Sequence, residues 1–267
     1  MFGSRSESMR LALLITKATA RIFCRKHSIA HILELEAKRS LGRMGGGGSI
    51  ALEVESALEL LKRSAIEQIY FWDVGANVGD YLSELMRLHP NVKVVAFEPS
   101  SAGFDKLKKR FSSDSRIKLE NFALSDLEGE AKLFSDFPGS GLGSLTKRNL
   151  DFIRIGFEHV EEIQISTGSS FLNKYQRVPD FIKIDVEGHE LAVLRGFDRR
   201  LFEISLIQFE FGGCNIDSRT YFKDFWLLLS SSFDIYRITP YGLVAIEKYS
   251  EEEESFMTSN FLAQRRV

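Results

Sequence analysis

The fold is decided by a short stretch in the first third of the chain, Phe71-Trp72-Asp73-Val74-Gly75-Ala76-Asn77-Val78-Gly79-Asp80-Tyr81. An apolar run of strand character reaches Val74, a glycine-containing turn follows, and a helical pattern begins near Tyr81. Gly75 permits the tight turn, and the small residues let a ligand approach the backbone. This order of strand, turn and helix predicts a ligand-binding loop at the carboxyl end of the first strand of an α/β sheet.

Strands and helices alternate along the chain that follows. We expect strands over 68–74, 92–97, 117–122, 181–186 and 205–211, and helices over 81–88, 102–111, 169–175, 190–196 and 221–230. Two short strands, 130–134 and 160–165, surround a loop rich in glycine and serine. The repeated β-α-β units predict an α/β fold with a doubly wound, mainly parallel sheet. Two closing strands, 234–238 and 243–247, predict an antiparallel hairpin at one edge.

The first 48 residues differ from the main domain, which we place at 49–267. Residues 9–38 show a helical pattern with interleaved basic residues, and the glycines at 45–48 predict a flexible linker. Three interpretations stay open for this N-terminal helical segment: a helix packed on the domain or on a partner, a disordered start, or an amphipathic anchor at a membrane surface. A second helical pattern, 50–69, leads into the main domain.

The composition is typical of a globular protein, with 44% hydrophobic and 27% charged residues. The formal net charge of −2 provides no basic field, so we expect no nucleic-acid partner. No uninterrupted apolar run is long enough to predict a membrane-spanning helix. Cys24 and Cys214 are far apart and form no CxxC pair, which argues against a zinc site and predicts a reducing compartment, the cytoplasm.

Two residues of the first loop favour one ligand over a dinucleotide. Asn77 stands where a dinucleotide-binding loop needs its second glycine to admit the pyrophosphate. Asp73 lies at the strand end, where a positively charged amino group can be held, and the following helix N-terminus suits a carboxylate. S-Adenosylmethionine carries both charges in its α-ammonium and α-carboxylate groups. We therefore interpret the loop as a binding site for this cofactor.

A second acidic residue follows the next strand, in Val94-Val95-Ala96-Phe97-Glu98-Pro99. A carboxylate at this position accepts hydrogen bonds from both hydroxyls of a ribose, and Pro99 ends the strand. The third strand leads to Asn121, which we expect to hydrogen-bond an adenine ring, and to Phe122 and Ala123, which we expect to form an apolar wall. Core packing is an equally good interpretation of Phe122.

Ionisable residues gather where the fourth strand meets its helix, in Phe181-Ile182-Lys183-Ile184-Asp185-Val186-Glu187-Gly188-His189-Glu190. Doubly wound sheets bind ligands beyond the carboxyl ends of their strands, so this turn predicts the reaction centre. Methyl transfer to oxygen often removes a proton from the acceptor. His189 is the natural general base near neutral pH, and Glu187 is the second candidate. We expect Asp185 to face the methionine end of the cofactor and Glu190 to complement the helix dipole.

A metal ion is the alternative way to activate an acceptor oxygen. Asp185 and Glu210, at the ends of the fourth and fifth strands, occupy plausible positions for Mg²⁺ ligands. Because Glu210 is the one strong carboxylate after the fifth strand, we expect no metal.

These motifs together resemble the FkbM-type methyltransferase family. The likeness rests on Asp73-Val-Gly-Ala-Asn-Val-Gly-Asp80, Phe97-Glu98-Pro99, Ala123-Leu-Ser-Asp126 and Ile182-Lys-Ile-Asp-Val-Glu-Gly-His-Glu190, and it covers about residues 71–247. The resemblance implies a Rossmann-like methyltransferase fold, S-adenosylmethionine as cofactor and O-methylation of a hydroxyl on a sugar, glycolipid or secondary metabolite. The loop Gly139-Ser-Gly-Leu-Gly-Ser-Leu145 is similar to the family's loop on the substrate side, which implies a substrate contact for Ser144. The resemblance fixes no general base.

Two other functions remain alternatives to a methyltransferase. One is a nucleotide-dependent oxidoreductase on a similar sheet, against which Asp73 and Asn77 argue. The other is a non-catalytic module that keeps the cofactor-binding fold. The full set of expected cofactor-binding residues is Asp73, Gly75, Ala76, Asn77, Gly79, Glu98, Pro99, Asn121, Phe122, Ala123 and Asp185.

Overall fold

The computed structural model describes residues 27–45, 48–62 and 67–266, together with Thr16. Helix α2 (His27–Ser40) confirms the later part of the helix expected over 9–38. Cys24 and the earlier part of that helix, apart from Thr16, lie outside the described residues, as do two glycines of the expected linker. The division into 1–48 and 49–267 stays a prediction.

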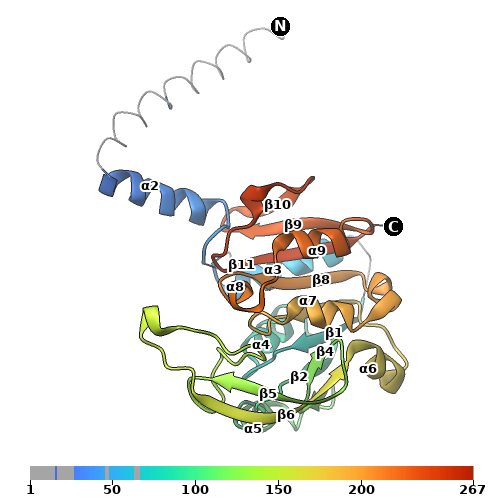
Figure 1. Cartoon of the computed structure of the whole chain (residues 1–267). Helices are drawn as coiled ribbons and strands as arrows, with labels where there is room; N and C mark the ends of the chain where they lie inside the picture. The colour runs from blue at the N-terminus through green and yellow to red at the C-terminus, as the bar shows by residue number, and fades with distance from the viewer. Residues whose placement is uncertain (1–15, 17–26, 46–47, 63–66, 267) are drawn as a thin grey trace, which may run out of the picture.

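An eight-stranded sheet forms the centre of the molecule, in the strand order β10-β9-β11-β8-β7-β1-β2-β3 (Figure 1). Its strands are β1 (Ile69–Val74), β2 (Val92–Phe97), β3 (Ile117–Glu120), β7 (Phe181–Ile184), β8 (Leu206–Phe211), β9 (Phe233–Thr239), β10 (Gly242–Ile246) and β11 (Ser259–Arg265). Five neighbouring strands, in the order β8-β7-β1-β2-β3, run parallel, and the expected β9–β10 hairpin forms an antiparallel edge. The sheet is therefore mainly parallel, as the alternation of elements predicts.

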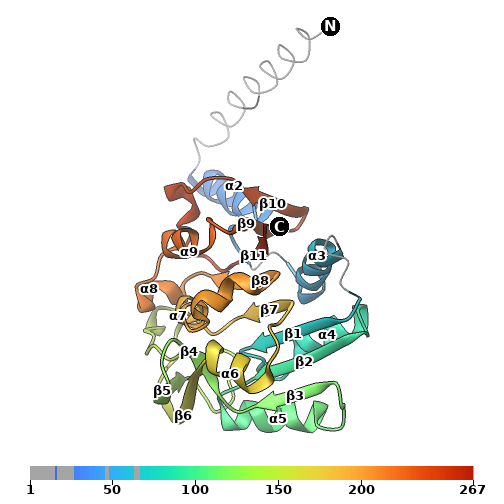
Figure 2. The same ribbon diagram turned by 90° about the vertical axis from the view of Figure 1, so that its right-hand side faces the viewer.

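Helices cover both faces of this sheet (Figure 2). One face carries α3 (Ile50–Lys62), α4 (Asp80–Leu88) and α5 (Ser101–Phe111), and the other carries α6 (Gly168–Tyr175), α7 (Glu190–Arg195) and α9 (Phe222–Leu229). Side chains alternate between the faces along each strand, so Phe71 belongs to the α3–α4 core and Trp72 to the α6–α7 core. Both are fully buried, and each such side chain contributes roughly 1.5–3 kcal/mol through its burial.

The strand order reverses at β1. The chain continues outward from β1 to β2 and β3, and later returns to β7 on the other side of β1. The parallel register places Asp73 beside Ala96 of β2 and Lys183 of β7. The carboxyl ends of β1, β2 and β7 therefore meet at the edge where doubly wound sheets bind their ligands.

A small three-stranded sheet lies beside this edge. It consists of β4 (Ala123–Ser125), β5 (Gly129–Ser135) and β6 (His159–Thr167) in the order β4-β6-β5, which includes the two expected short strands. The long loop 136–158 connects β5 to β6 and projects from the domain (Figure 1). The remaining elements are the short helix α8 (Cys214–Ser218) and the 3₁₀ helices η1 (Asp151–Ile153), η2 (Asp198–Glu203) and η3 (Glu251–Glu253).

Helix α2 lies outside the helices that cover the two faces of the sheet, next to the edge formed by β9 and β10 (Figures 1 and 2). Its side chains are largely exposed, among them Ile32 at 58% and Leu33 at 46%. None of the helices in the described part of the chain combines the length and apolar content that a membrane crossing needs.

Candidate functional site

Backbone hydrogen bonds hold the loop after β1, and two of them reach the end of β2. The N–H groups of Gly75 and Ala76 both donate to the carbonyl oxygen of Phe97, and the N–H of Gly79 donates to that of Ala76. Gly75 has a φ of 81°, and a Cβ atom there would lie 1.9 Å from the carbonyl oxygen of Asp185. Only glycine therefore allows the tips of β1 and β7 to make this contact. This reason for Gly75 adds to the tight turn and the approach of a ligand, which the sequence predicts.

Glu98, at the tip of β2, is tied to this loop. Its carboxylate accepts hydrogen bonds from the backbone N–H groups of Asn77 at 2.8 Å and Ser100 at 2.9 Å. Burial raises the pKa of Glu98 to about 7, against the lowering effect of these two hydrogen bonds. Each carboxylate oxygen has two lone pairs, so Glu98 can accept two further hydrogen bonds from a ligand.

Glu98 borders a pocket whose wall is partly apolar and also contains Asp185, Glu187 and His189. The lining includes Val74, Pro99, Phe122, Ala123, Leu124, Leu133, Leu145 and Val186. Phe122 lines this pocket and also packs edge-on against Phe171, with ring centroids 5.5 Å apart. Its expected role as a wall for adenine stays a prediction. The Asn121 amide nitrogen donates to the carbonyl oxygens of Glu98 and Pro99 and so holds the turn after β2. Its expected bond to adenine stays a prediction.

A second pocket continues from the first at the tips of β1 and β7. The two share Gly75, Asn77, Gly141 and Asp185 in their linings. The second pocket is charged, with a lining that includes Glu53, Asp80, Lys183, Asp185 and Glu210. Together they form one cavity. Most of its apolar side chains lie in the first part, which also holds Glu98, Glu187 and His189, while the second part holds Lys183 among four carboxylates.

Asp73 lies beneath the wall of the charged pocket. It is 0% exposed, and neither carboxylate oxygen has a hydrogen-bond partner among the described residues. The Lys183 ammonium is 3.9 Å away. Burial raises the pKa of Asp73 to about 6, although Lys183 lowers it. Asp73 lines neither pocket, and Lys183 is the charged group beside it. Its expected contact with the amino group of a ligand stays a prediction.

The tip of β7 and the loop 136–158 meet at Glu187. This residue has a left-handed backbone, with φ at 53°, and its carboxylate accepts a 2.6 Å hydrogen bond from Arg148. The Arg148 guanidinium also lies 3.6 Å from the carboxylate of Asp217. Burial, and then Asp185, raise the pKa of Glu187 to about 7, while Arg148 lowers it. Glu187 is thus a carboxylate whose proton affinity suits acid–base chemistry near neutral pH.

Ser144 supports this loop. It is 1% exposed, and its hydroxyl donates to the carbonyl oxygen of Glu187 at 2.7 Å and accepts from the N–H of Thr146 at 3.1 Å. These two contacts hold the loop against Glu187. The substrate contact expected for Ser144 stays a prediction.

His189 borders the apolar pocket, in the same lining as Glu98. Its Nε2 atom lies 2.9 Å from the hydroxyl of Ser125 in β4. Burial lowers the pKa of His189, and Asp126 opposes this effect, so the ring is neutral at pH 7. Glu190 is 0% exposed and accepts hydrogen bonds from the backbone N–H groups of Val186 and Gly188, in line with the structural role expected for it.

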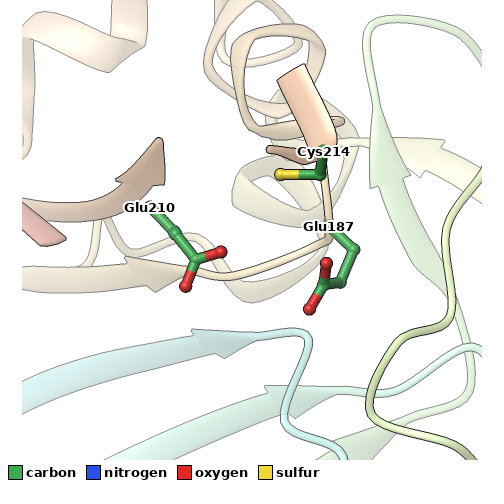
Figure 3. A group of neighbouring side chains, drawn as sticks. All are labelled: Glu187, Glu210 and Cys214. Atoms are coloured by element: carbon green, nitrogen blue, oxygen red, sulfur yellow. The ribbon is translucent and has the colours of Figure 1, made fainter. Parts of the chain in front are cut away.

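Three side chains with metal-ligating atoms meet beyond the tips of β7 and β8. Figure 3 shows the carboxylates of Glu187 and Glu210 and the thiol of Cys214 around a common space, and these atoms lie within 4.8 Å of one another. Asp185, the expected partner of Glu210, is instead 3.1 Å from Lys183. Two carboxylates and a thiol do not match the all-oxygen shell of Mg²⁺, and Arg148 already pairs with Glu187. The absence of a metal stays a prediction.

Sequence reasoning did not find Glu53, Lys183 and Arg148 as site residues. Lys183 interrupts the apolar run of β7, and this local break is the one signal available for it. Arg148 lies 39 residues before Glu187, in a loop without a periodic pattern. Glu53 comes from the first turn of α3, where an acidic residue is most simply a complement to the helix dipole.

One protein-family model, the Methyltransferase FkbM domain, matches residues 73–234. A methyltransferase from Sordaria araneosa, sdnD, is 28% identical over an alignment of 160 residues that covers 49% of this chain and 61% of that protein. The hexuronic acid methyltransferase AglP of Haloferax volcanii is 26% identical over 155 residues, which are 57% of this chain and 60% of that protein. The chain thus spans about three fifths of the length of these relatives.

Solved structures show a distant likeness. The plantazolicin methyltransferase BpumL, in complex with a monoazolic desmethylPZN analog and SAH, is 11% identical with a TM-score of 0.44, and the match covers 97% of this chain and 99% of that one. Magnesium protoporphyrin IX methyltransferase from Synechocystis, with bound SAM, is 11% identical with a TM-score of 0.41, covering 81% of this chain and 79% of that one.

Proposed function

The chain belongs to the FkbM methyltransferase family, and we propose that it transfers the methyl group of S-adenosylmethionine to a hydroxyl group of a sugar, glycolipid or secondary metabolite. Its fold is the Rossmann-like methyltransferase fold, and its cofactor is S-adenosylmethionine. The acceptor class is supported by the relatives, one of which is named a hexuronic acid methyltransferase.

The observation that carries this proposal is the division of the cavity into a more apolar and a more charged end. S-Adenosylmethionine has the same division: an adenine base and a ribose at one end, and an amino acid at the other. Glu98 borders the apolar end, where ribose hydroxyls can donate to its carboxylate. Glu53, Lys183 and Asp185 border the charged end. A pyrophosphate would meet several carboxylates there, which disfavours the dinucleotide alternative.

We assign the remaining cofactor contacts by position. Gly75, Ala76, Asn77 and Gly79 form the turn that separates the two ends of the cavity. Pro99, Phe122 and Ala123 form the wall against which a base would pack. When bound, S-adenosylmethionine supplies a methyl group made electrophilic by its sulfonium.

Glu187 is our assignment for the group that removes the acceptor's proton. Its carboxylate lies beyond the tip of β7, and the Arg148 contact fixes its orientation. A base whose pKa is near 7 is partly ionised at neutral pH and binds a proton well, which is the best compromise for general base catalysis. His189, the other candidate, lines the same pocket as Glu187, but its Nε2 atom is held by the Ser125 hydroxyl, and we propose that it helps to position the cofactor.

Two measurements test the proposed function. Isothermal titration with S-adenosylmethionine, S-adenosylhomocysteine and NAD should show binding of the two adenosyl ligands and none of NAD. Transfer of a labelled methyl group to neutral sugars, uronic acids and glycolipids, followed by mass spectrometry of the products, should then give an ether-linked methyl group. Binding of NAD alone would contradict the proposal, and a methyl ester on a uronic acid would contradict the hydroxyl as acceptor.

A further inference from the structure

A row of polar side chains crosses the sheet beneath the charged pocket. The register pairs Asp73 of β1 with Lys183 of β7, and Lys183 with Gln208 of β8. Their neighbours on this face of the sheet are apolar, because it packs against α3 and α4. The Tyr81 hydroxyl donates to Gln208 at 2.6 Å, and Gln208 donates to Glu53 at 2.8 Å. Burial of polar groups is costly, so a continuous polar row in this core indicates that these groups serve the pocket above it.

Lys183 is the cation of this row. It is 7% exposed, and its ammonium lies 3.1 Å from Asp185 and 3.9 Å from Asp73, over the ring of Tyr81. Burial lowers the pKa of Lys183, but Asp185 and Asp73 more than offset this effect, so the pKa stands above its usual value. One of its three N–H donors is accounted for by Asp185, and the contact with Asp73 is longer than a hydrogen bond.

Few groups in the wall of the charged pocket can bind an anion. Among the described residues that line it, Lys183 is the single cationic side chain, beside the acidic Glu53, Asp80, Asp185 and Glu210. In the loop after β1, the N–H groups of Gly75, Ala76, Asn77 and Gly79 already donate to acceptors of the protein. The N–H groups of Val78 and Asp80, two residues that also line the pocket, remain as uncharged donors at the start of α4. A carboxylate entering this pocket therefore finds its favourable charge at Lys183.

We propose that Lys183 binds the α-carboxylate of the cofactor, while Asp185 and Glu53 face its α-ammonium. The inference rests on the proposed function, because it takes the adenosyl cofactor as the ligand of this cavity. In this arrangement the cofactor's carboxylate meets Lys183, and its ammonium meets the acidic groups next to Lys183: Asp185, 3.1 Å from the Lys183 ammonium, and Glu53, which bonds to Gln208. The alternative is that Lys183 only neutralises Asp73 and Asp185 and has no contact with the ligand.

The two roles separate when the carboxylate is removed from the ligand. We would measure the dissociation constants of S-adenosylhomocysteine and of decarboxylated S-adenosylhomocysteine, which keeps the amine, by isothermal titration. The wild-type protein should prefer the ligand with the carboxylate by about 10- to 100-fold, as expected for a charge-assisted contact. In Lys183→Met the preference should fall below about threefold, because only the carboxylate loses a partner. Lys183→Arg, which keeps the charge, should retain most of the preference.

The outcomes are distinct. Equal weakening of both ligands in Lys183→Met would show a structural role and overturn the proposal, and so would a wild-type preference below about threefold, whatever the variants do. Thermal unfolding and circular dichroism check the fold of each variant. Should Lys183→Met not fold, Lys183→Gln keeps a hydrogen bond to Asp185 without the charge and takes its place. If the wild-type protein binds neither ligand, the proposed function itself is wrong, and the assignment of Lys183 is overturned with it.

Discussion

The backbone N–H of Asn77 donates a 2.8 Å hydrogen bond to the carboxylate of Glu98, and so joins the loop after β1 to the tip of β2. This bond orients the carboxylate and leaves its other lone pairs able to accept hydrogen bonds from a ligand in the pocket. The residue that stands in place of a second glycine thus has a structural role, because its backbone, at a φ of 48°, presents the N–H to Glu98. A change at Glu98 should therefore affect both cofactor binding and the geometry of this loop.

Glu98→Ala should weaken the binding of S-adenosylhomocysteine by about 1.5–3 kcal/mol, or about 10- to 150-fold, because two charge-assisted contacts to a ribose are lost. Isothermal titration measures this change directly. Glu130→Gln is the matched control, since Glu130 is exposed and bonds to Gln164 in the small sheet. A dissociation constant within twofold of the wild-type value in Glu98→Ala would remove Glu98 from the binding site.

Glu187→Gln should lower kcat by about 10²- to 10⁴-fold, the usual contribution of a general base, with the affinity for S-adenosylhomocysteine within about threefold of wild type. The base must be ionised, so wild-type kcat at saturating cofactor should rise with pH through about 7 and then level off. The variant should lose this rise. Glu158→Gln, which removes an exposed carboxylate paired with Lys147 in the same loop, is the control and should keep the wild-type profile.

His189→Ala should weaken the binding of S-adenosylhomocysteine about three- to tenfold and leave kcat at saturating cofactor within about threefold. The reason is its place in the pocket that Glu98 borders, with Nε2 beside the hydroxyl of Ser125. Ser125→Ala should reproduce part of the binding effect, because it releases the ring. A hundredfold loss of kcat with unchanged affinity would instead identify His189 as the base, the first candidate that the sequence suggests.

Much of the fold could be predicted because its signals are local. The strand ending at Val74, its glycine turn and the acid at Glu98 lie within one β-α-β unit, and periodicity alone places them. Strand β11 (Ser259–Arg265) was not predicted, and it lies between β9 and β8. Residues 259–263 are all buried, so the strand shows no alternation of polar and apolar residues over most of its length. Its position depends on pairing with segments more than twenty residues earlier in the chain.

The candidate site was predictable where a motif carries the residue and unpredictable where a distant contact does. Asp185 and Glu187 come from a single strand-to-helix turn. Arg148 reaches Glu187 from the loop 136–158, and the pairing of Lys183 with Asp73 joins residues 110 positions apart. The burial of the Ser144 side chain likewise follows from packing of its loop against the tip of β7, which a linear pattern does not encode.

Removing divalent metal should leave methyl transfer intact. Glu187, Glu210 and Cys214 bring two hard donors and one soft donor together, and the Arg148 guanidinium already neutralises Glu187. We expect activity within about twofold of the untreated protein after dialysis against EDTA, measured by transfer of a labelled methyl group. Loss of activity that Mg²⁺ or Zn²⁺ restores, and that Glu210→Gln abolishes, would replace this interpretation with a metal site.

The free energy of unfolding of the cofactor-free protein should fall as the pH rises from about 5 to 8. Burial raises the pKa of Asp73 to about 6 and those of Glu98, Glu187 and Glu190 to about 7. The folded state therefore binds these protons more tightly than the unfolded chain does. This contribution is complete below a pH of about 4, the usual range of carboxyl pKa values, and is lost as the pH passes through 6 to 7.

Asp114, whose pKa a hydrogen bond from Arg116 lowers to about 2, has the opposite effect only below a pH of about 4, outside this window. His189, whose pKa burial lowers, opposes the slope in the acidic part of the window, but it is one group against four carboxylates. Urea unfolding at intervals of half a pH unit measures the slope. Glu98→Gln should flatten it, because a neutral amide has no proton to lose, whereas Glu130→Gln should not. A stability that increases between pH 5 and 8 would mean that these carboxylates are ionised in the folded protein, and that the cavity is far better solvated than its burial indicates.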